Sequence, residues 1–322
     1  MKIAVGTDQG VLVLKSAEVE AETWTLLAHG QHSRRFESLA AAPDGTLYAG
    51  AETGLVCCTR DLENWRSFAE GLANQGVRAL SLHPAEPDIL YAGTEPAALF
   101  RSQDRGVHWE RLGGFHAVPG ASRWSYPNPP YRAMVTCLLQ HPQHPRALMA
   151  GIALGGLVAS LDGGLTWAER QQGLGREVYA LAMHPARPAR VYAATGAGLF
   201  RSDDLASTWN PIHHGIPYLC ARTVAVDPED PDRLMAGVLQ QRDGGASMIA
   251  RSADAGQTWQ VVAQGLPSLQ GQSITAVVAL PGTWVFGTDT GGLFASSNFG
   301  ESWRRIRNTC PPVRALLGLG AS

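Results

Sequence analysis

A short segment recurs along the chain and fixes the spacing of the sequence between its copies. Its clearest copy is "SLDGGLTW", residues 160–167, and four others end at Trp109, Trp209, Trp259 and Trp303. The segment combines a hydroxyl, a carboxylate and glycines, which an active site could use. Five copies in one chain are better explained as one kind of turn built five times. The sequence therefore predicts a repeat protein.

The repeated unit is longer than the segment and consists of short strands. In residues 77–112 we expect four strands, "VRALSL", "ILYAG", "ALFRS" and "HWERL", separated by turns rich in Gly, Pro and Asp. Residues 135–170 and 178–212 repeat this pattern. Seven tryptophans anchor the units, and 322 residues divided by seven gives 46 per unit: Trp24, Trp65, Trp109, Trp167, Trp209, Trp259 and Trp303. This period predicts an all-β, seven-bladed β-propeller of four-stranded antiparallel blades.

The two ends of the sequence belong to one unit. "IAVGTDQGVLVLKS" near the start matches the second and third strands, and "PVRALLGLG" near the end repeats the innermost strand of residues 77–80. We expect the C-terminal strand to close the first blade in a 3+1 arrangement, which leaves no open sheet edge. The chain is then one domain, with approximate blades 1–30 plus 312–320, 36–71, 77–113, 134–173, 177–216, 221–265 and 273–307.

The repeated segment resembles the Asp-box (BNR) repeat of sialidases, sortilin-type receptors and photosystem II stability-factor propellers. Residues 102–109, 160–167 and 252–259 match best, whereas residues 18–24 and 59–65 are degenerate. The resemblance implies a turn between the third and fourth strands. Short polar side chains accept hydrogen bonds from turn amides and the indole packs beneath. We therefore assign a turn-ordering role to Ser102, Asp104, Ser160, Asp162, Asp204, Ser252 and Asp254.

A second set of polar residues precedes proline in the predicted turns between the first and second strands. His83, His141 and His184 occupy the same place as Asp227 of "VDPEDPD". Because a carboxylate takes the same position, we expect these imidazoles to cap turns rather than bind metal.

Composition excludes several classes of protein. The net charge is −2 and 17% of residues are charged, so we expect no nucleic-acid partner. No apolar run approaches the roughly 20 residues that span a bilayer, and the start lacks the apolar core of a signal peptide. The five cysteines form no CxxC pair. We expect a reduced, cytoplasmic protein without a membrane partner.

Two extensions interrupt the repeat, and both fall on the face opposite to the repeated turns. Residues 113–134 lengthen the connection between blades 3 and 4, and residues 239–247 lengthen a loop in blade 6. We expect the first to be a cap loop over a pocket, with Trp124 in contact with a ligand. Alternatively, both extensions are neutral surface insertions. The aromatic residues of the first extension could likewise form only a small core of their own.

One polar residue per blade stands at the start of the innermost strand, between an apolar residue and a small one. Around the ring these are Arg314, Glu37, Arg78, Thr136, Tyr179, Arg222 and Thr275. We expect the three arginines and the two threonines to bind an anionic or polar small ligand, with Glu37 and Tyr179 as candidate catalytic residues. The alternative is that the ring residues pair with one another or with loop carboxylates such as Asp8, Glu52, Glu95 and Asp289.

The residue types of this ring are similar to those of sialidases, in which three arginines hold a carboxylate beside a Tyr/Glu pair and an Asp. Sialidases have six blades and an Arg-Ile-Pro motif that this chain lacks, so we do not expect sialidase activity. Histidines in loops of the same face could instead hold a divalent metal, the one cofactor considered: His32, His116, His213 and His214.

Three functions remain open from the sequence. The first is a small-molecule site, with a hydrolase or lyase reaction on an anionic or polar substrate. The second is a non-catalytic scaffold that binds a protein partner, as the resemblance to the photosystem II stability factors implies. The third is a glycan-binding or glycoside-cleaving protein.

Overall fold

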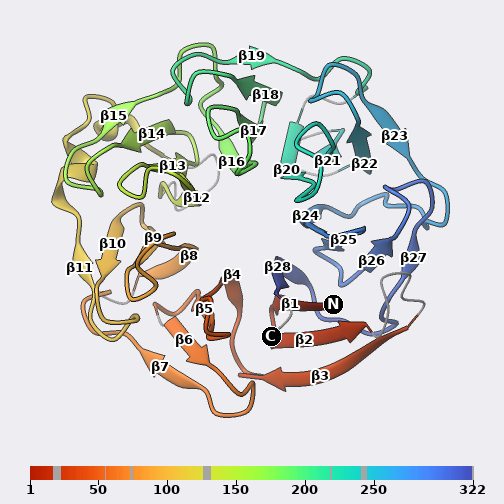
Figure 1. Cartoon of the computed structure of the whole chain (residues 1–322), viewed down its shortest axis with the longest axis horizontal. Coiled ribbons are helices and arrows are strands. Elements are labelled where there is room, and N and C mark those ends of the chain that lie inside the picture. The colour runs from red at the N-terminus through yellow and green to blue at the C-terminus, as the bar shows by residue number, and fades with distance from the viewer. Residues whose placement is uncertain are drawn as a thin grey trace.

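Seven four-stranded antiparallel sheets are arranged in a ring (Figure 1). In a β-propeller of this kind the innermost strands surround a central channel. The computed structural model describes residues 1–16, 23–54, 56–72, 75–125, 132–217, 220–240 and 245–320. Most of the degenerate segment 18–24 lies outside these ranges. The predicted seven-bladed β-propeller is confirmed.

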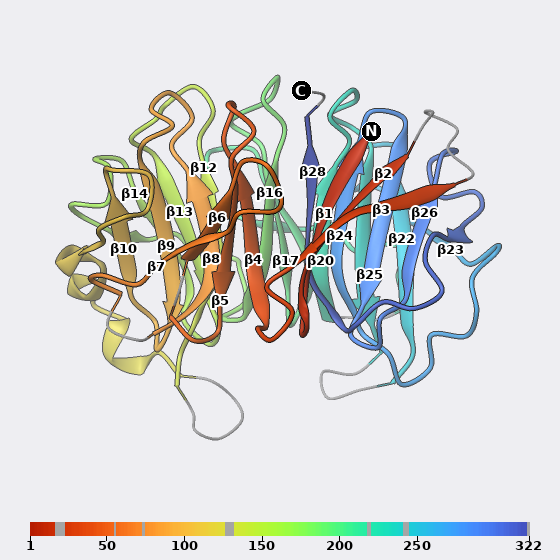
Figure 2. The same cartoon turned by 90° about the horizontal axis from the view of Figure 1, so that it is seen from below.

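The first blade joins the two ends of the chain. It contains β1 (Lys2–Thr7), β2 (Gly10–Ser16), β3 (Trp24–Gly30) and the innermost β28 (Val313–Leu319), in the order β28-β1-β2-β3. β1 pairs with β28 from Lys2 opposite Leu319 to Thr7 opposite Val313. The predicted 3+1 closure is therefore confirmed, and Figure 2 shows both chain ends on the same side of the molecule.

The other six blades are built from consecutive strands. Blade 2 contains β4 (Phe36–Ala41), β5 (Leu47–Ala51), β6 (Val56–Thr59) and β7 (Arg66–Phe68). Blade 3 contains β8 (Gly76–Leu82), β9 (Leu90–Glu95), β10 (Leu99–Ser102) and β11 (Glu110–Arg111). Blade 4 contains β12 (Val135–Gln140), β13 (Leu148–Ile152), β14 (Gly156–Ser160) and β15 (Ala168–Glu169). Blade 5 contains β16 (Val178–Met183), β17 (Val191–Thr195), β18 (Gly198–Ser202) and β19 (Asn210–Pro211). Blade 6 contains β20 (Cys220–Val226), β21 (Leu234–Leu239), β22 (Ser247–Ser252) and β23 (Gln260–Val262). Blade 7 contains β24 (Ile274–Leu280), β25 (Thr283–Thr288), β26 (Leu293–Ser296) and β27 (Arg304–Arg305).

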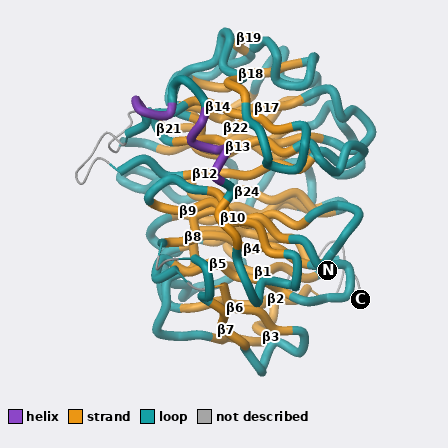
Figure 3. The backbone as a smooth tube through the Cα atoms, turned by 90° about the vertical axis from the view of Figure 1, so that its left-hand side faces the viewer, coloured by secondary structure: helices purple, strands orange, loops and turns teal. Residues whose placement is uncertain are grey.

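The core lies between neighbouring blades. Every residue of β5, β13 and β17 is buried, because both faces of these second strands contact adjacent sheets. The described helices are two short 3₁₀ turns in the first extension, η1 (Gly113–Ala117) and η2 (Ala121–Arg123), shown in purple in Figure 3. No described helix is long and apolar enough to cross a membrane.

The repeated segment forms a hydrogen-bonded turn. Ser160 Oγ donates to Asp162 Oδ1 (2.7 Å) and accepts from the Gly164 amide (2.8 Å). Asp162 accepts from the Thr166 amide at 2.9 Å, and Trp167 Nε1 donates to the Gly164 carbonyl at 3.0 Å. The same Ser-to-Asp or Ser-to-Asn bond recurs in blades 3, 5, 6 and 7, at Ser102–Asp104, Ser202–Asp204, Ser252–Asp254 and Ser296–Asn298.

In blades 3 to 6, the residue before proline caps the turn between the first and second strands. His83 Nδ1 accepts from the Glu86 amide at 3.0 Å and His141 Nδ1 from the His144 amide at 2.9 Å. Asp227 Oδ1 does the same for the Glu229 amide at 2.9 Å. These imidazoles order turns on the same face as the repeated segments.

Candidate functional site

The innermost strand of every blade contains a β-bulge at the ring position. In β4, Phe36 pairs with Ala51 and Ser38 with Gly50, so Glu37 has no partner on β5. The residue left over is always the one predicted from the sequence: Arg314, Glu37, Arg78, Thr136, Tyr179, Arg222 and Thr275. A bulge redirects the extra side chain out of the alternation of the strand. It therefore explains how one polar residue per blade reaches the channel mouth.

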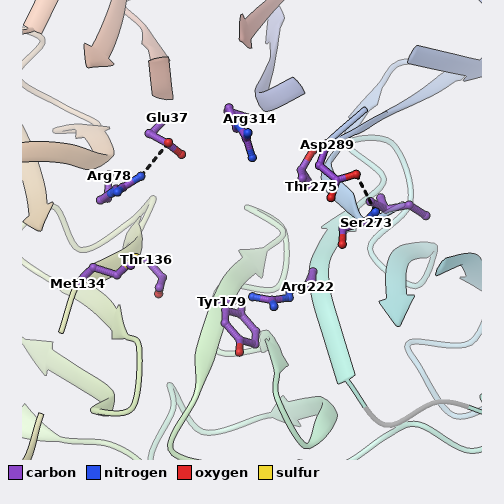
Figure 4. A pocket seen from close by; sticks show the side chains of 11 residues that line it. Glu37, Arg78, Met134, Thr136, Tyr179, Arg222, Ser273, Thr275, Asp289 and Arg314 are labelled. Atoms are coloured by element: carbon purple, nitrogen blue, oxygen red, sulfur yellow. Dashed lines mark hydrogen bonds and ion pairs between the residues drawn. The ribbon is translucent and has the colours of Figure 1, made fainter. Parts of the chain in front are cut away.

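These seven side chains line a single pocket of about 330 Å³, completed by Met134, Ser273, Ile274 and Asp289 (Figure 4). Met134 lies at the end of the first extension and Asp289 follows β25. Both lie on the face opposite to the repeated turns. Residues 126–131 and 241–244 of those extensions lie outside the described ranges.

Carboxylates hold the ring arginines Arg78 and Arg314. Arg78 Nη1 lies 2.7 Å from Glu37 Oε1, and Arg78 Nε donates to Glu95 Oε2 at 2.8 Å. Arg314 donates to both oxygens of Asp8 at 2.6 and 2.8 Å. The carboxylate-pairing alternative thus holds for these two arginines.

Arg35 connects the two ion pairs into one network. It contacts Glu37 and lies 3.2 Å from Asp8. The hydrogen bond from Arg314 is the main reason that the pKa of Asp8 lies below its usual value. These contacts form a series of charges of alternating sign, in the order Arg314, Asp8, Arg35, Glu37, Arg78 and Glu95. Arg314, Glu37 and Arg78 of this series line the pocket.

The other side of the pocket is built around Tyr179. The guanidinium of Arg222 lies over its ring, 4.2 Å from the centroid. Its hydroxyl donates to Glu177 Oε2 at 3.1 Å, and Glu177 is 4% exposed. Burial raises the pKa of Tyr179, so the phenol stays protonated near neutral pH.

The two ring threonines use their protons to join blades. Thr136 Oγ1 donates to the Val178 carbonyl of the next blade. Thr275 Oγ1 donates to the Val313 carbonyl at 2.8 Å. Each hydroxyl oxygen retains the capacity to accept a hydrogen bond from a ligand.

Trp124 lies outside the group of side chains that line this pocket. Its ring packs 4.9 Å from Phe115 and 5.6 Å from His116, measured between centroids. Both neighbours belong to the same extension. Trp124 therefore packs against aromatic residues of the extension, and its contact with a ligand stays a prediction.

The four histidines considered for a metal do not gather at one point. His32 pairs with His29 (centroids 3.9 Å apart), and His213 with His214 (6.5 Å). Across the described ranges, no group of three or more His, Cys, Asp or Glu side chains is arranged to hold a metal ion.

Sequence reasoning missed two charged residues of the site. Arg35 directly precedes Phe36 and bridges two carboxylates, and Glu177 directly precedes Val178 and accepts from Tyr179. In blades 2 and 5, a charged residue two positions before the ring residue therefore indicated a partner for the ring.

No protein-family model and no curated protein matches the chain. Its fold is similar to solved structures. A GH74 xyloglucanase from Xanthomonas campestris superposes with a TM-score of 0.70 at 20% identity, over 94% of this chain and 52% of that chain. YCF48 from Cyanidioschyzon merolae gives 0.59 at 14% identity, over 84% of each chain. YCF48 bound to D1 peptide gives 0.59 at 13%, over 84% and 81%.

This chain spans about half the length of the xyloglucanase and 38% of a second similar GH74 enzyme. At these identities the similarity shows the shared fold. Glycoside hydrolase and YCF48 propellers both have it, so the fold does not choose between their activities.

Proposed function

We propose that this propeller binds a small polar ligand in the pocket at its channel mouth. The observation that carries the proposal is the bulge that directs one ring residue from every blade into that pocket. Strands that only packed against one another would not need a polar side chain at the same bulge in most blades. The volume of about 330 Å³ also falls in the usual range of ligand pockets, roughly 300–1,000 Å³.

The contacts favour a ligand that carries both hydroxyl groups and one anionic group. Paired guanidinium and carboxylate groups keep N–H donors and oxygen lone pairs, which hydroxyl groups can use. The anionic group fits beside Arg222, whose guanidinium projects into the pocket in Figure 4. A guanidinium stacked on a ring still has donors along its edge.

The contacts of the candidate catalytic residues favour binding of the ligand over its chemical conversion. Glu37 contacts two guanidinium groups, from Arg35 and Arg78. Tyr179 donates its proton to Glu177. A hydrolase or lyase reaction would require the ligand to displace these contacts.

The test is a thermal-shift and calorimetric screen of sugar acids, neutral monosaccharides and small dicarboxylates. We expect at least one compound to raise the melting temperature of the wild type. Arg222→Ala should weaken its binding about tenfold or more, because a hydrogen bond to a charged group contributes about 1.5–3 kcal/mol.

Arg251→Ala is the matched control, since Arg251 lies over the Phe299 ring at 5.3 Å, away from the pocket. It should bind the same compound as the wild type does. Equal affinity in the Arg222 variant and the wild type would contradict the proposal, and so would a screen without any binder.

A peptide is the second candidate ligand, favoured by the similar fold of YCF48 bound to D1 peptide. The same calorimetric assay with acidic peptides distinguishes the two. Binding of peptides but of none of the small compounds, lost in Arg222→Ala, would support this candidate instead.

A further inference from the structure

The face opposite to the pocket carries two exposed leucines in the blade 4 turn. Leu161 and Leu165 expose 66% and 63% of their surface. The same turn is built elsewhere with other residues at the Leu161 position, namely Gln103, Asp203, Ala253 and Ser297, and at the Leu165 position, namely Val107, Ser207, Gln257 and Glu301. Formation of the turn therefore does not require leucine at either position.

Leu161 lines a mostly apolar groove of about 690 Å³ that runs across three blades. Leu205, from the repeated turn of blade 5, lines it together with Ala85, Pro145 and Ala147 from the first turns of blades 3 and 4. An exposed apolar groove is a surface that a partner can cover.

The groove carries one acidic and one basic side chain besides its histidines. Glu86 comes from the blade 3 turn and Arg146 from the blade 4 turn, and both are exposed. Within the described part of the chain, the Arg146 guanidinium makes no hydrogen bond or ion pair. An apolar centre with one charge of each sign is complementary to itself when rotated about a two-fold axis.

We propose that two copies of this chain associate through this face about a two-fold axis. The leucines of each copy pack into the groove of the other, and Glu86 of one copy lies against Arg146 of the second. Both channel-mouth pockets then face outward, in opposite directions. The dimer would bind two ligands at once, or two sites of one extended ligand.

The test is sedimentation velocity over a range of protein concentrations. We expect a concentration-dependent dimer in the wild type. Combining Leu161→Gln with Leu165→Glu should give a monomer at every concentration. Gln103 and Glu301 occupy these positions in blades 3 and 7, so the variant should keep the melting temperature of the wild type.

The matched control changes two exposed leucines of another blade in the same way. Leu26→Gln with Leu27→Glu alters residues of β3 that are 40% and 45% exposed, in blade 1. This variant should dimerise as the wild type does.

Charge reversal tests the two-fold pairing directly. Glu86→Arg and Arg146→Glu should each raise the dimer dissociation constant at least about tenfold, because each places like charges together. The double variant should recover the wild-type value, since it restores opposite charges at both contacts.

A wild type that is monomeric at every concentration would overturn the proposal. So would a dimer that survives the Leu161/Leu165 substitutions, a dimer lost equally in the Leu26/Leu27 control, or a double charge reversal that does not restore association.

Discussion

Asp162 shows how a single side chain orders a turn. Its carboxylate accepts from the side chain and the amide of Thr166, and these bonds lower its pKa to about 2. Asp204 accepts from Thr208 in the same way and also has a pKa of about 2. Repetition of the segment made these contacts predictable, because each copy repeats the same donors and acceptors within eight residues.

Acid should therefore weaken the fold through these turns. A carboxyl whose pKa is lower in the folded chain than its ordinary 3.8 stabilises the fold above that value and loses this contribution as the pH falls toward about 2. We expect the melting temperature to fall between about pH 4 and pH 2, and Asp162→Asn to fall less steeply there. Thermal melts across that pH range, monitored by circular dichroism, measure both.

Asn298 is the natural precedent for this variant. In blade 7 it takes the place of the aspartate and accepts from the Ser302 amide at 3.0 Å. Asp162→Asn should accordingly fold at pH 7. Identical pH profiles of the variant and the wild type would show that the carboxylate contributes nothing to acid sensitivity.

The electrostatic partners at the channel mouth illustrate what the sequence could not decide. It offered several carboxylates for the ring arginines without choosing among them. Arg314 pairs with Asp8 across 306 positions of sequence, and only the closed ring places them together. The packing of Trp124 was open for a related reason: an aromatic residue in a loop can face a pocket or its own loop, and in the structure Trp124 packs against Phe115.

At the scale of the element, the innermost strand of each blade contains a bulge that the sequence did not predict. The sequence showed an apolar residue, a polar one and a small one in each blade, such as Val77, Arg78 and Ala79. Alternation alone would point Arg78 to one face of the sheet. The bulge depends on pairing with β9, which the local sequence does not reveal.

A glycine after the outermost strand also depends on the neighbouring blade. Gly71 has a φ of +89°, and a Cβ there would lie 1.9 Å from the backbone oxygen of Trp109. Gly45 has a similar φ of +86°, but its Cβ would meet nothing within 4 Å. Substitution of these two glycines therefore separates the free-energy cost of the backbone conformation from that of the contact between blades.

We expect Gly45→Ala to lower the free energy of unfolding by about 1–2 kcal/mol, the cost of the left-handed conformation. Gly71→Ala should lower it by at least about 1–3 kcal/mol more, because the methyl group forces the blades apart. Urea denaturation of both variants measures the difference. Equal losses would show that the contact with Trp109 can relax without cost.

At the scale of the whole molecule, closure depends on the last strand. β28 is the innermost strand of blade 1 and also supplies Arg314 to the pocket. A chain that ends at residue 312 would leave the edge of β1 unpaired, and unpaired edges associate with other chains.

We therefore expect the chain of residues 1–312 to aggregate or to lack a cooperative thermal transition. A synthetic peptide of residues 313–320 should restore both monodispersity and the transition. A chain that ends at Leu319 keeps all of β28 and serves as the control. Cooperative unfolding of the 1–312 chain without the peptide would contradict the role assigned to β28. Size-exclusion chromatography and calorimetric melts provide the readouts.

The bulged ring has a consequence for how such a molecule changes over evolutionary time. Each blade supplies one ring residue to the pocket, and that residue is skipped in the pairing between the first and second strands. A single-codon mutation at one of these seven positions can alter what the pocket recognises while the ladders on either side stay as they are. Chains of this kind can diverge in ligand one blade at a time, and the same positions form a compact library for laboratory selection.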